Sequence, residues 1–298
     1  MTSREDIDAS LTFARSNHFN HVFVQVRGRG DSYYNSRIVP RAEGIEDPSL
    51  DPLGYAVRRG HELGLKVHAW LNVYYVWSSD RPPRDPSHVI LRHPDWLDRP
   101  APGHSHPSGS RFLSPSHPEA AVYLLAVFEE ILKEYEIDGL HLDYIRYRDA
   151  DMGYHEFARW DFEKRHGFDP LFLLKTDNPG SNPLTRKERE SMSWQWDQYR
   201  RDAVTSLLQK CNALVLEQKP RATLSVAVKP DPEEAKIRYF QEWDRWLAQG
   251  LVDYVVAMNY SPDLRTFART IDRIYESVPP RYWRGVIMGI AVYNQDAL

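Results

Sequence analysis

Cysteine is almost absent from the sequence, since Cys211 is the only one among 298 residues. A disulfide framework within the chain and a cysteine-based zinc cluster are therefore excluded. No apolar run approaches the roughly 18 residues that a membrane-spanning helix needs, so we expect no membrane span. Residues 1–10 are polar and acidic and show no signal peptide, which leaves the localisation open.

An excess of charge of one sign is also lacking. The sequence has 38 Lys and Arg against 42 Asp and Glu, a formal charge of −4, and no block rich in Lys or Arg. This balance predicts no nucleic-acid partner. Aromatic residues, in contrast, make up 12% of the chain, with 9 Trp and 17 Tyr. Aromatic rings line sugar-binding clefts and also fill protein cores, so composition alone does not separate these roles.

The hydrophobic pattern alternates between the periods of strands and helices, as an α/β protein requires. Helical spacing is clearest at 118–135, where Ser116 and Glu119 predict a capping box. Another long helix is predicted to end near Pro220. Short runs rich in Val, Leu and Ile predict six strands, at 21–27, 66–72, 138–145, 223–229, 253–260 and 285–293. Further helices are predicted near 4–16, 51–63 and 240–249, and loops at 78–117 and 167–184.

Strand–helix alternation over this length favours a (β/α)₈ TIM barrel formed as a single domain over residues 1–298. A doubly wound dinucleotide-binding sheet is disfavoured, because Gly28 and Gly30 follow the first strand without a correctly placed third glycine. Only six strands are visible. A helix precedes the first of them, so we expect that the first and eighth barrel strands are missing from this chain.

Each predicted strand has one apolar face and one face that ends in a polar residue. In 66–72, for example, Val67, Ala69 and Leu71 alternate with His68, Trp70 and Asn72. Burying unpaired charged groups inside a barrel is costly, and barrel enzymes carry their chemistry at the C-terminal ends of the strands. We therefore predict a functional cleft there, lined by the inward polar ends Arg27, Asn72, Asp143, Lys229, Asn259 and Tyr293.

Several of these segments resemble a known family, the bacterial glycosyl hydrolase-like family ten. The resemblance is carried by VFVQVRGRGDSYYNSRIVPRAEG, DPLGYAVRRGHELGLKVHAWLN, DGLHLDYIRY, SVAVKPD, QEWDRWLAQGLVDYVVAMNYS and GIAVY, which occur in the family's order over most of residues 20–293. It implies a (β/α)₈ barrel that hydrolyses glycosidic bonds of bacterial cell-wall or other polysaccharides. It implies no cofactor, and members are often exported to the periplasm or the cell exterior.

Asp143 is the strongest candidate for a catalytic residue. Its spacing from Asp138 and Gly139 resembles the fourth strand of α-amylase-like barrels, in which the second Asp is the nucleophile. In chitinase-type barrels the catalytic Glu would fall on Ile145, which argues against that mechanism. A carboxylate can attack the anomeric carbon or stabilise an oxocarbenium-like charge. Asp138 lies at the start of the strand and is expected to cap a turn.

Glycoside hydrolysis also needs a second carboxyl group as acid, and its identity is open. The amylase pattern would place a Glu after strand 223–229, but that position reads Lys229-Pro230-Asp231. The candidates are Asp31 and Glu43 in the loop after strand 21–27, and Asp231 just beyond the rim. We favour Asp31 or Glu43, because both lie in stretches that resemble the family.

The remaining candidates are expected to bind sugar hydroxyls or stack on sugar rings. They are Arg27, His68, Trp70, Asn72, His141, Tyr144, Lys229, Asn259, Tyr260 and Tyr293. Trp194, Trp196, Trp243 and Trp246 lie on predicted helices and are expected in the core. Two alternatives stay open: a carbohydrate-binding barrel without catalysis, and a metal-dependent hydrolase or deacetylase that uses His141 and Asp143.

Overall fold

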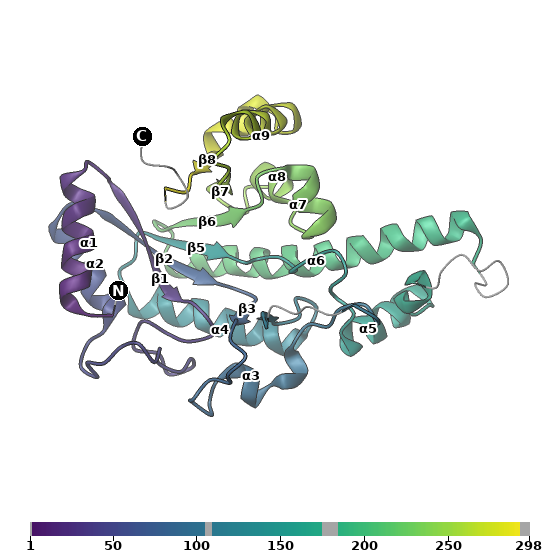
Figure 1. Ribbon diagram of the computed structural model, residues 1–298, viewed down its shortest axis with the longest axis horizontal. Coiled ribbons are helices and arrows are strands. Elements are labelled where there is room, and N and C mark those ends of the chain that lie inside the picture. The colour runs from purple at the N-terminus through teal and green to yellow at the C-terminus, as the bar shows by residue number, and fades with distance from the viewer. Residues whose placement is uncertain (1, 105–108, 175–183, 293–298) are drawn as a thin grey trace.

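The computed structural model describes residues 2–104, 109–174 and 184–292, and its centre is a sheet of six parallel strands (Figure 1). In spatial order the strands are β1 (His21–Arg27), β2 (Lys66–Asn72), β5 (Gly139–Asp143), β6 (Thr223–Val228), β7 (Tyr254–Met258) and β8 (Val286–Gly289). Every neighbouring pair runs parallel. Within the described residues the sheet is open, because β1 and β8 each pair with a single neighbour.

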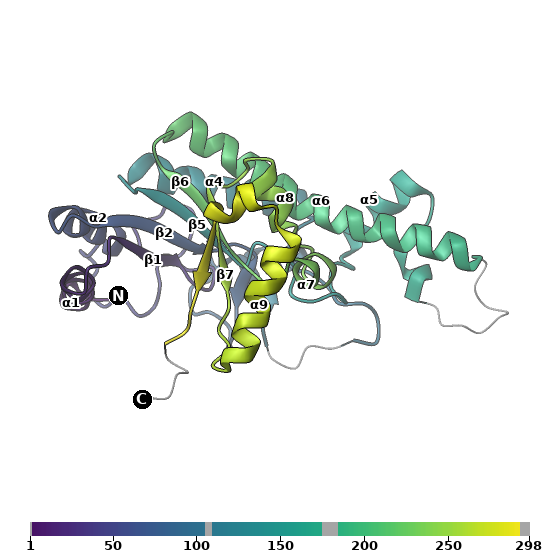
Figure 2. The ribbon, with the colours of Figure 1, turned by 90° about the horizontal axis from the view of Figure 1, so that it is seen from above.

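Helices connect these strands and cover the outer face of the sheet. The helices α1 (Arg4–Ser16) and α2 (Pro52–Glu62) flank β1 and β2, and α4 (Pro118–Glu134) packs against α6 (Arg186–Gln218) (Figure 1). Beside the last strands lie α7 (Pro232–Arg238), α8 (Trp243–Ala248) and α9 (Leu264–Ser277). Both views show that α6 extends past the sheet toward α5 (Glu156–His166) (Figures 1 and 2).

The predicted α/β barrel architecture is confirmed, and the described residues contain each predicted strand within a few residues of its expected bounds. The segments expected as loops contain short elements. A small antiparallel pair joins β3 (Tyr75–Trp77) to β4 (Arg111–Phe112), and α3 (Val89–Arg92) lies between them. The described residues also form three short 3₁₀ helices, η1 (Pro94–Trp96), η2 (Pro170–Leu174) and η3 (Pro280–Gly285).

The capping box predicted at Ser116 and Glu119 is wrong. The N-cap of α4 is His117, which makes no side-chain capping bond. The Ser116 hydroxyl instead forms a hydrogen bond with the Tyr147 hydroxyl (2.8 Å), and Glu119 accepts from the Trp96 indole N–H (3.2 Å). Both side chains therefore take tertiary partners in place of the local ones that their spacing predicts.

Three of the four helix tryptophans are buried as expected, since Trp196, Trp243 and Trp246 are at most 1% exposed. The prediction that Trp194 lies in the core is wrong, because 63% of this residue is exposed to solvent. Residues two apart on a helix lie about 200° apart around its axis, so Trp194 and Trp196 point to opposite sides of α6. Trp196 packs into a small cluster with Tyr154, Phe162 and other residues of α5 and η2, whereas Trp194 faces away from it.

The face of the sheet opposite the helices carries histidine and aromatic rings. His68 stacks on Phe23 at 4.8 Å between ring centroids, and His141 meets Phe23 edge-on at 4.8 Å. The His21 Nδ1 and the His68 Nε2 share a hydrogen bond of 2.7 Å, and the His141 Nδ1 shares one of 2.9 Å with the Ser225 hydroxyl. These contacts form a packed floor below the C-terminal ends of the strands.

Burial keeps both floor histidines neutral. Loss of solvent lowers the pKa of His68 to about 4, with the neighbouring His21 acting in the same direction. It lowers the pKa of His141 to about 3, with His68 as the second cause. Asp138, at the other end of β5, behaves as expected for a turn residue: its carboxylate accepts from the Val67 backbone N–H (2.9 Å) and the Lys66 ammonium (2.7 Å).

In the part of the chain that the structure describes, no helix is both long enough and apolar enough to cross a membrane.

Gly139→Ala is expected to destabilise the fold, because a Cβ at this position would lie 2.2 Å from His68 Nδ1 and 2.6 Å from Thr223 Oγ1. Overpacking of this kind costs about 1–3 kcal/mol, which chemical denaturation would measure as a lower free energy of unfolding. Gly44→Ala is the control, since its nearest neighbour would be a Thr2 methyl group at 3.4 Å. Equal stability of the two variants would contradict the described packing around Gly139.

The depressed pKa of His68 predicts a pH-dependent stability. Between pH 6.5 and about 4 the unfolded chain binds a proton at His68 that the folded chain does not, so the free energy of unfolding falls as pH falls through this window. The slope is at most about 1.4 kcal/mol per pH unit for one group. Urea denaturation of the unsubstituted protein and of His68→Gln at several pH values measures this slope. The slope is expected to be shallower in the variant, and equal slopes would contradict this assignment.

Candidate active site

Polar and aromatic side chains gather where β2, β5 and β6 end. Asp143 is the last residue of β5 and lies opposite Asn72, the last residue of β2. Asp143 is 7% exposed and Asn72 is 5% exposed, so both are buried at the rim. Lys229 directly follows β6. The parallel strands thus bring an amide, a carboxyl group and an ammonium group to one edge of the sheet. The polar residues at the ends of the predicted strands lead to the same expectation.

The backbone turns sharply directly after Asp143. Tyr144 has a φ of 51°, a left-handed conformation that is uncommon for a residue with a side chain. Its N–H donates to the Asp143 Oδ1 at 2.6 Å, and its ring stacks on Tyr75 at 4.8 Å. Such conformations persist where surrounding contacts enforce them, and they cluster at functional sites. The turn fixes the Asp143 carboxyl group against its own backbone.

Two cationic groups flank this carboxyl group. The Arg146 guanidinium lies between the Tyr144 and Tyr239 rings, 4.9 and 5.0 Å from their centroids. The Lys229 ammonium lies 4.8 Å from the Tyr239 centroid. Burial lowers the pKa of both groups, and their mutual repulsion lowers that of Lys229 further. Asp143 counteracts this effect on both, so the three charges depend on one another.

The pKa of the Asp143 carboxyl group is raised above its usual value. Burial is the largest cause, because removing the group from water disfavours its charged form. The Tyr144 N–H, the positive charges of Arg146 and Lys229 and the Trp70 side chain act in the opposite direction. The net result is a carboxyl group whose proton is held more tightly than in water, next to two cations that stabilise its ionised form.

Asp31 belongs to the same end of the sheet. The Asn72 amide donates to the Gly28 carbonyl at 2.7 Å, and the Asp31 Oδ1 lies 3.5 Å from where a Cβ on Gly28 would be. Asp31 is 8% exposed and accepts from the Arg29 N–H at 2.7 Å. A short path of contacts therefore leads from Asp143 through Asn72 and Gly28 to Asp31.

Glu43 occupies a different environment. Its side chain is 47% exposed and forms an ion pair with Arg84 at 3.5 Å, and it also accepts from the Arg84 backbone N–H at 3.0 Å. The Glu43 carboxylate is therefore exposed to solvent and already paired with an arginine. Of the two carboxyl groups favoured as partners of Asp143, only Asp31 is buried.

Arg27 is turned away from the site. The alternation of strand faces predicts that it points inward, but the β1–β2 register shifts between Gln25 and Arg27, so that Arg27 lies opposite Leu71. Its guanidinium donates to the Val73 carbonyl at 3.1 Å and lies 5.9 Å from the Tyr123 centroid on α4. This irregularity moves Arg27 to the helix side of the sheet, where it is fully buried.

The other residues predicted to bind sugar lie in different parts of the sheet. His68 and His141 lie in the floor described above, with His141 edge-on to Trp70 at 6.5 Å. At the end of β7, the Asn259 amide donates to the Phe267 carbonyl at 3.0 Å, while Tyr260 is 42% exposed. Tyr293 lies outside the described residues.

Sequence reasoning missed three side chains of this site, namely Arg146, Tyr75 and Tyr239. Arg146 lies within the DGLHLDYIRY segment, three residues after Asp143, so its position was available as a signal. Tyr75 and Tyr239 come from β3 and from the end of α7, and only the tertiary structure brings them here. Within the described ranges, no three His, Cys, Asp or Glu side chains converge in a way that would hold a metal ion.

Comparisons with known proteins agree with this architecture. The chain is 26% identical over 340 residues to glycosyl hydrolase DigH of Escherichia coli K12, covering 98% of this chain and 68% of DigH. It is 24% identical over 265 residues to glycosyl hydrolase YngK of Bacillus subtilis, covering 81% of this chain and 46% of YngK. These proteins share long segments with the chain at low identity.

A solved structure shares the fold. The glycoside hydrolase domain of PgaB (BpsB) from Bordetella bronchiseptica matches with a TM-score of 0.65 at 15% identity, over 96% of this chain and 78% of that one. The family model described as Glycosyl hydrolase-like 10 matches residues 3–290. The match spans nearly the whole sequence, including every strand of the sheet, and the chain belongs to the glycosyl hydrolase-like 10 family.

Proposed function

We propose that the protein is a glycoside hydrolase that cleaves glycosidic bonds of a polysaccharide, with Asp143 as its central catalytic residue. The observation that carries this proposal is the buried Asp143 carboxyl group at the C-terminal end of β5, between the Arg146 and Lys229 cations. A carboxylate held there attacks the anomeric carbon or stabilises the positive charge that develops on the sugar ring. Family membership supports the reaction class.

Asp31 is the proposed second carboxyl group, acting as acid and base. It is buried, whereas Glu43 is exposed and paired with Arg84. Strands lie about 4.8 Å apart, so the loop after β1 starts roughly 10 Å along the sheet from β5, which leaves room for a sugar ring between the two carboxyl groups. Asp31 is buried at the edge of the sheet where Asp143 lies, and Glu43 is exposed, which favours Asp31 as the proton donor.

The surrounding side chains supply sugar contacts in this proposal. The Asn72 Oδ1 is buried without a hydrogen-bond partner among the described residues, and a sugar hydroxyl would supply one. The Trp70, Tyr144 and Tyr260 rings offer apolar faces, and Lys229 offers donors at the end of β6. Bacterial cell-wall glycans are the first substrate class to test. The absence of a Glu after β6 keeps open the alternative of a carbohydrate-binding barrel without catalysis. Glycan binding without release of reducing ends would favour that alternative.

Asp143→Asn is expected to lower turnover by roughly 10²–10⁴-fold, because the amide neither attacks the sugar nor balances its charge. The assay scores new reducing ends from peptidoglycan strands and from plant and microbial glycans. Asp138→Asn is the matched control at the opposite end of β5. It is expected to reduce stability, since Asp138 holds the start of the strand, while turnover of the folded protein is kept. Full activity of Asp143→Asn would refute the assignment.

The choice of acid is tested by comparing Asp31→Asn with Glu43→Gln in the same assay. Loss of the proton donor is expected to lower turnover by roughly 10²–10⁴-fold in Asp31→Asn, with little change in Glu43→Gln. The reverse result would assign the acid to Glu43. If both variants keep full turnover, neither carboxyl group is the acid.

Lys229→Met is expected to move the acidic limb of the pH–activity profile upward. The Lys229 ammonium lowers the pKa of Asp143, so its removal raises that pKa and a higher pH is needed to ionise the carboxyl group. Lys187→Met, an exposed residue at the start of α6, is the control. A limb that stays in place would show that Lys229 does not act on the ionising group.

A further inference from the structure

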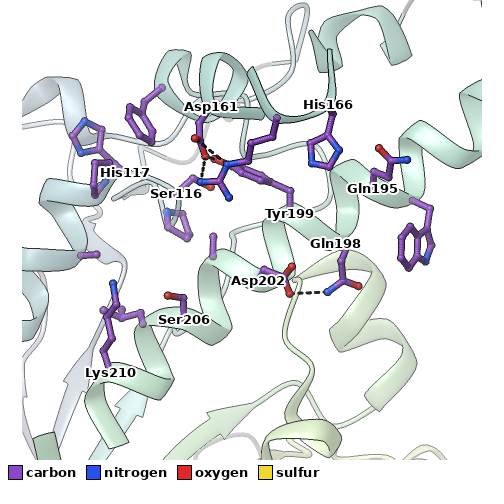
Figure 3. A pocket seen from close by; sticks show the side chains of 18 residues that line it. Ser116, His117, Asp161, His166, Gln195, Gln198, Tyr199, Asp202, Ser206 and Lys210 are labelled. Atoms are coloured by element: carbon purple, nitrogen blue, oxygen red, sulfur yellow. Dashed lines mark hydrogen bonds and ion pairs between the residues drawn. The ribbon is translucent and has the colours of Figure 1, made fainter. Parts of the chain in front are cut away.

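A concave surface lies between α5, α6 and the start of α4, and none of the side chains around Asp143 lines it. The α5–α6 groove is lined by one face of α6, by α5 and by residues 115–118 before and at the start of α4 (Figure 3). Its volume is about 540 Å³, within the range of ligand-binding clefts. Nothing in the proposed hydrolytic mechanism uses it.

A stripe of polar side chains runs along the α6 side of this groove. Gln195, Gln198, Asp202, Ser206 and Lys210 recur every three or four residues, and Figure 3 shows them on the same side of the helix. The Gln198 amide donates to Asp202 at 2.8 Å. The Gln195, Ser206 and Lys210 side chains make no hydrogen bond within the described part of the chain. From Trp194 to Lys210 the stripe is about 24 Å long, given the helical rise per residue.

The α5–α6 groove has no excess of charge. The Asp161 carboxylate is neutralised by Arg165 at 2.8 Å and accepts from the Tyr199 hydroxyl at 2.9 Å. Asp202 and Lys210 are opposite in sign, and the remaining basic side chains of the lining are the imidazoles of His117 and His166. Polyanions such as nucleic acids bind through clusters of positive charge, which are lacking here. The chemistry instead fits a neutral ligand with many hydroxyl groups, because amides and hydroxyls both donate and accept hydrogen bonds and carboxylates accept them.

Trp194 completes this chemistry at one end of the stripe. Its side chain lines the groove, yet the residue is 63% exposed, although a tryptophan is usually mostly buried. It lies four residues before Gln198, so the ring and the amide share a face of α6. An exposed indole next to free hydrogen-bonding groups offers an apolar plane and polar contacts at once.

We propose that the α5–α6 groove is a second carbohydrate-binding site, in which Trp194 stacks on a sugar ring and the polar stripe of α6 binds hydroxyl groups of an extended glycan. The choice of a glycan over another neutral polymer rests on the proposed function. The groove binds the chain of the substrate outside the catalytic centre and holds the enzyme on polymeric material.

The test measures binding directly, in full-length protein that carries Asp143→Asn so that the probes are not consumed. The probes are soluble peptidoglycan strands, an N-acetylglucosamine hexasaccharide and a xylose hexasaccharide, titrated by calorimetry. Adding Trp194→Ala is expected to weaken the groove component roughly tenfold, because aromatic contacts of this kind contribute about one order of magnitude in affinity. A blue shift of the Trp194 fluorescence on titration is a second expected readout.

Trp160→Ala is the matched control, since Trp160 is 54% exposed on α5 but does not line the groove. It is expected to leave glycan affinity unchanged. Equal affinity of the Trp194→Ala and Trp160→Ala proteins would overturn the proposal, and so would a lack of binding by all three probes. Binding of an unstructured peptide mixture in place of glycans, lost in Trp194→Ala, would also overturn it and assign the groove to peptides. These readouts need no turnover, so they are independent of whether Asp143 is catalytic.

Discussion

The burial of one carboxyl group at the end of a central strand is the constraint on which the candidate site depends. Asp143 loses most of its water, which raises its pKa, and the Tyr144 N–H, Arg146 and Lys229 restore part of the lost stabilisation. Each cation is itself partly desolvated and depends on Asp143 in turn. A buried charge is tolerated only with such partners. The three groups therefore form one electrostatic unit, and a sugar ring entering the site would exchange the remaining water for this fixed set of charges.

The floor beneath Asp143 explains how this unit is held in place. In a barrel filled with aliphatic side chains the rim could shift by small rearrangements. Here the Phe23 ring stacks on His68 and meets His141 edge-on, and the two histidine rings form hydrogen bonds with His21 and Ser225. Gly139 is required below this layer because a side chain would meet His68. Rings that are both packed and hydrogen-bonded fix the height and orientation of β5, and with it the position of its last residue.

Much of the fold and the centre of the site follow from local patterns. The alternation along 66–72 and 138–145 predicts which face of β2 and β5 is apolar, and it places Asn72 and Asp143 together at the rim. The same rule fails for Arg27, because an irregularity in the β1–β2 register reverses its direction, and the sequence gives no sign of it. Tyr75 and Tyr239 reach the site from elements whose placement depends on tertiary packing. Trp194 was expected in the core because helical spacing alone does not reveal that α6 extends past the sheet.

The groove on α6 and the rim of the sheet are joined by one residue, Tyr147. Its hydroxyl group bonds Ser116, which lines the groove, and its backbone N–H donates to the Tyr239 carbonyl at 3.1 Å. The Tyr239 ring in turn covers Arg146 and Lys229. Tyr147 is fully buried, so this connection does not compete with water. These hydrogen bonds tie the position of the groove to that of the rim. A polymer bound in the groove and at the rim would therefore present only some of its glycosidic bonds to Asp143. A short oligosaccharide would occupy either surface alone.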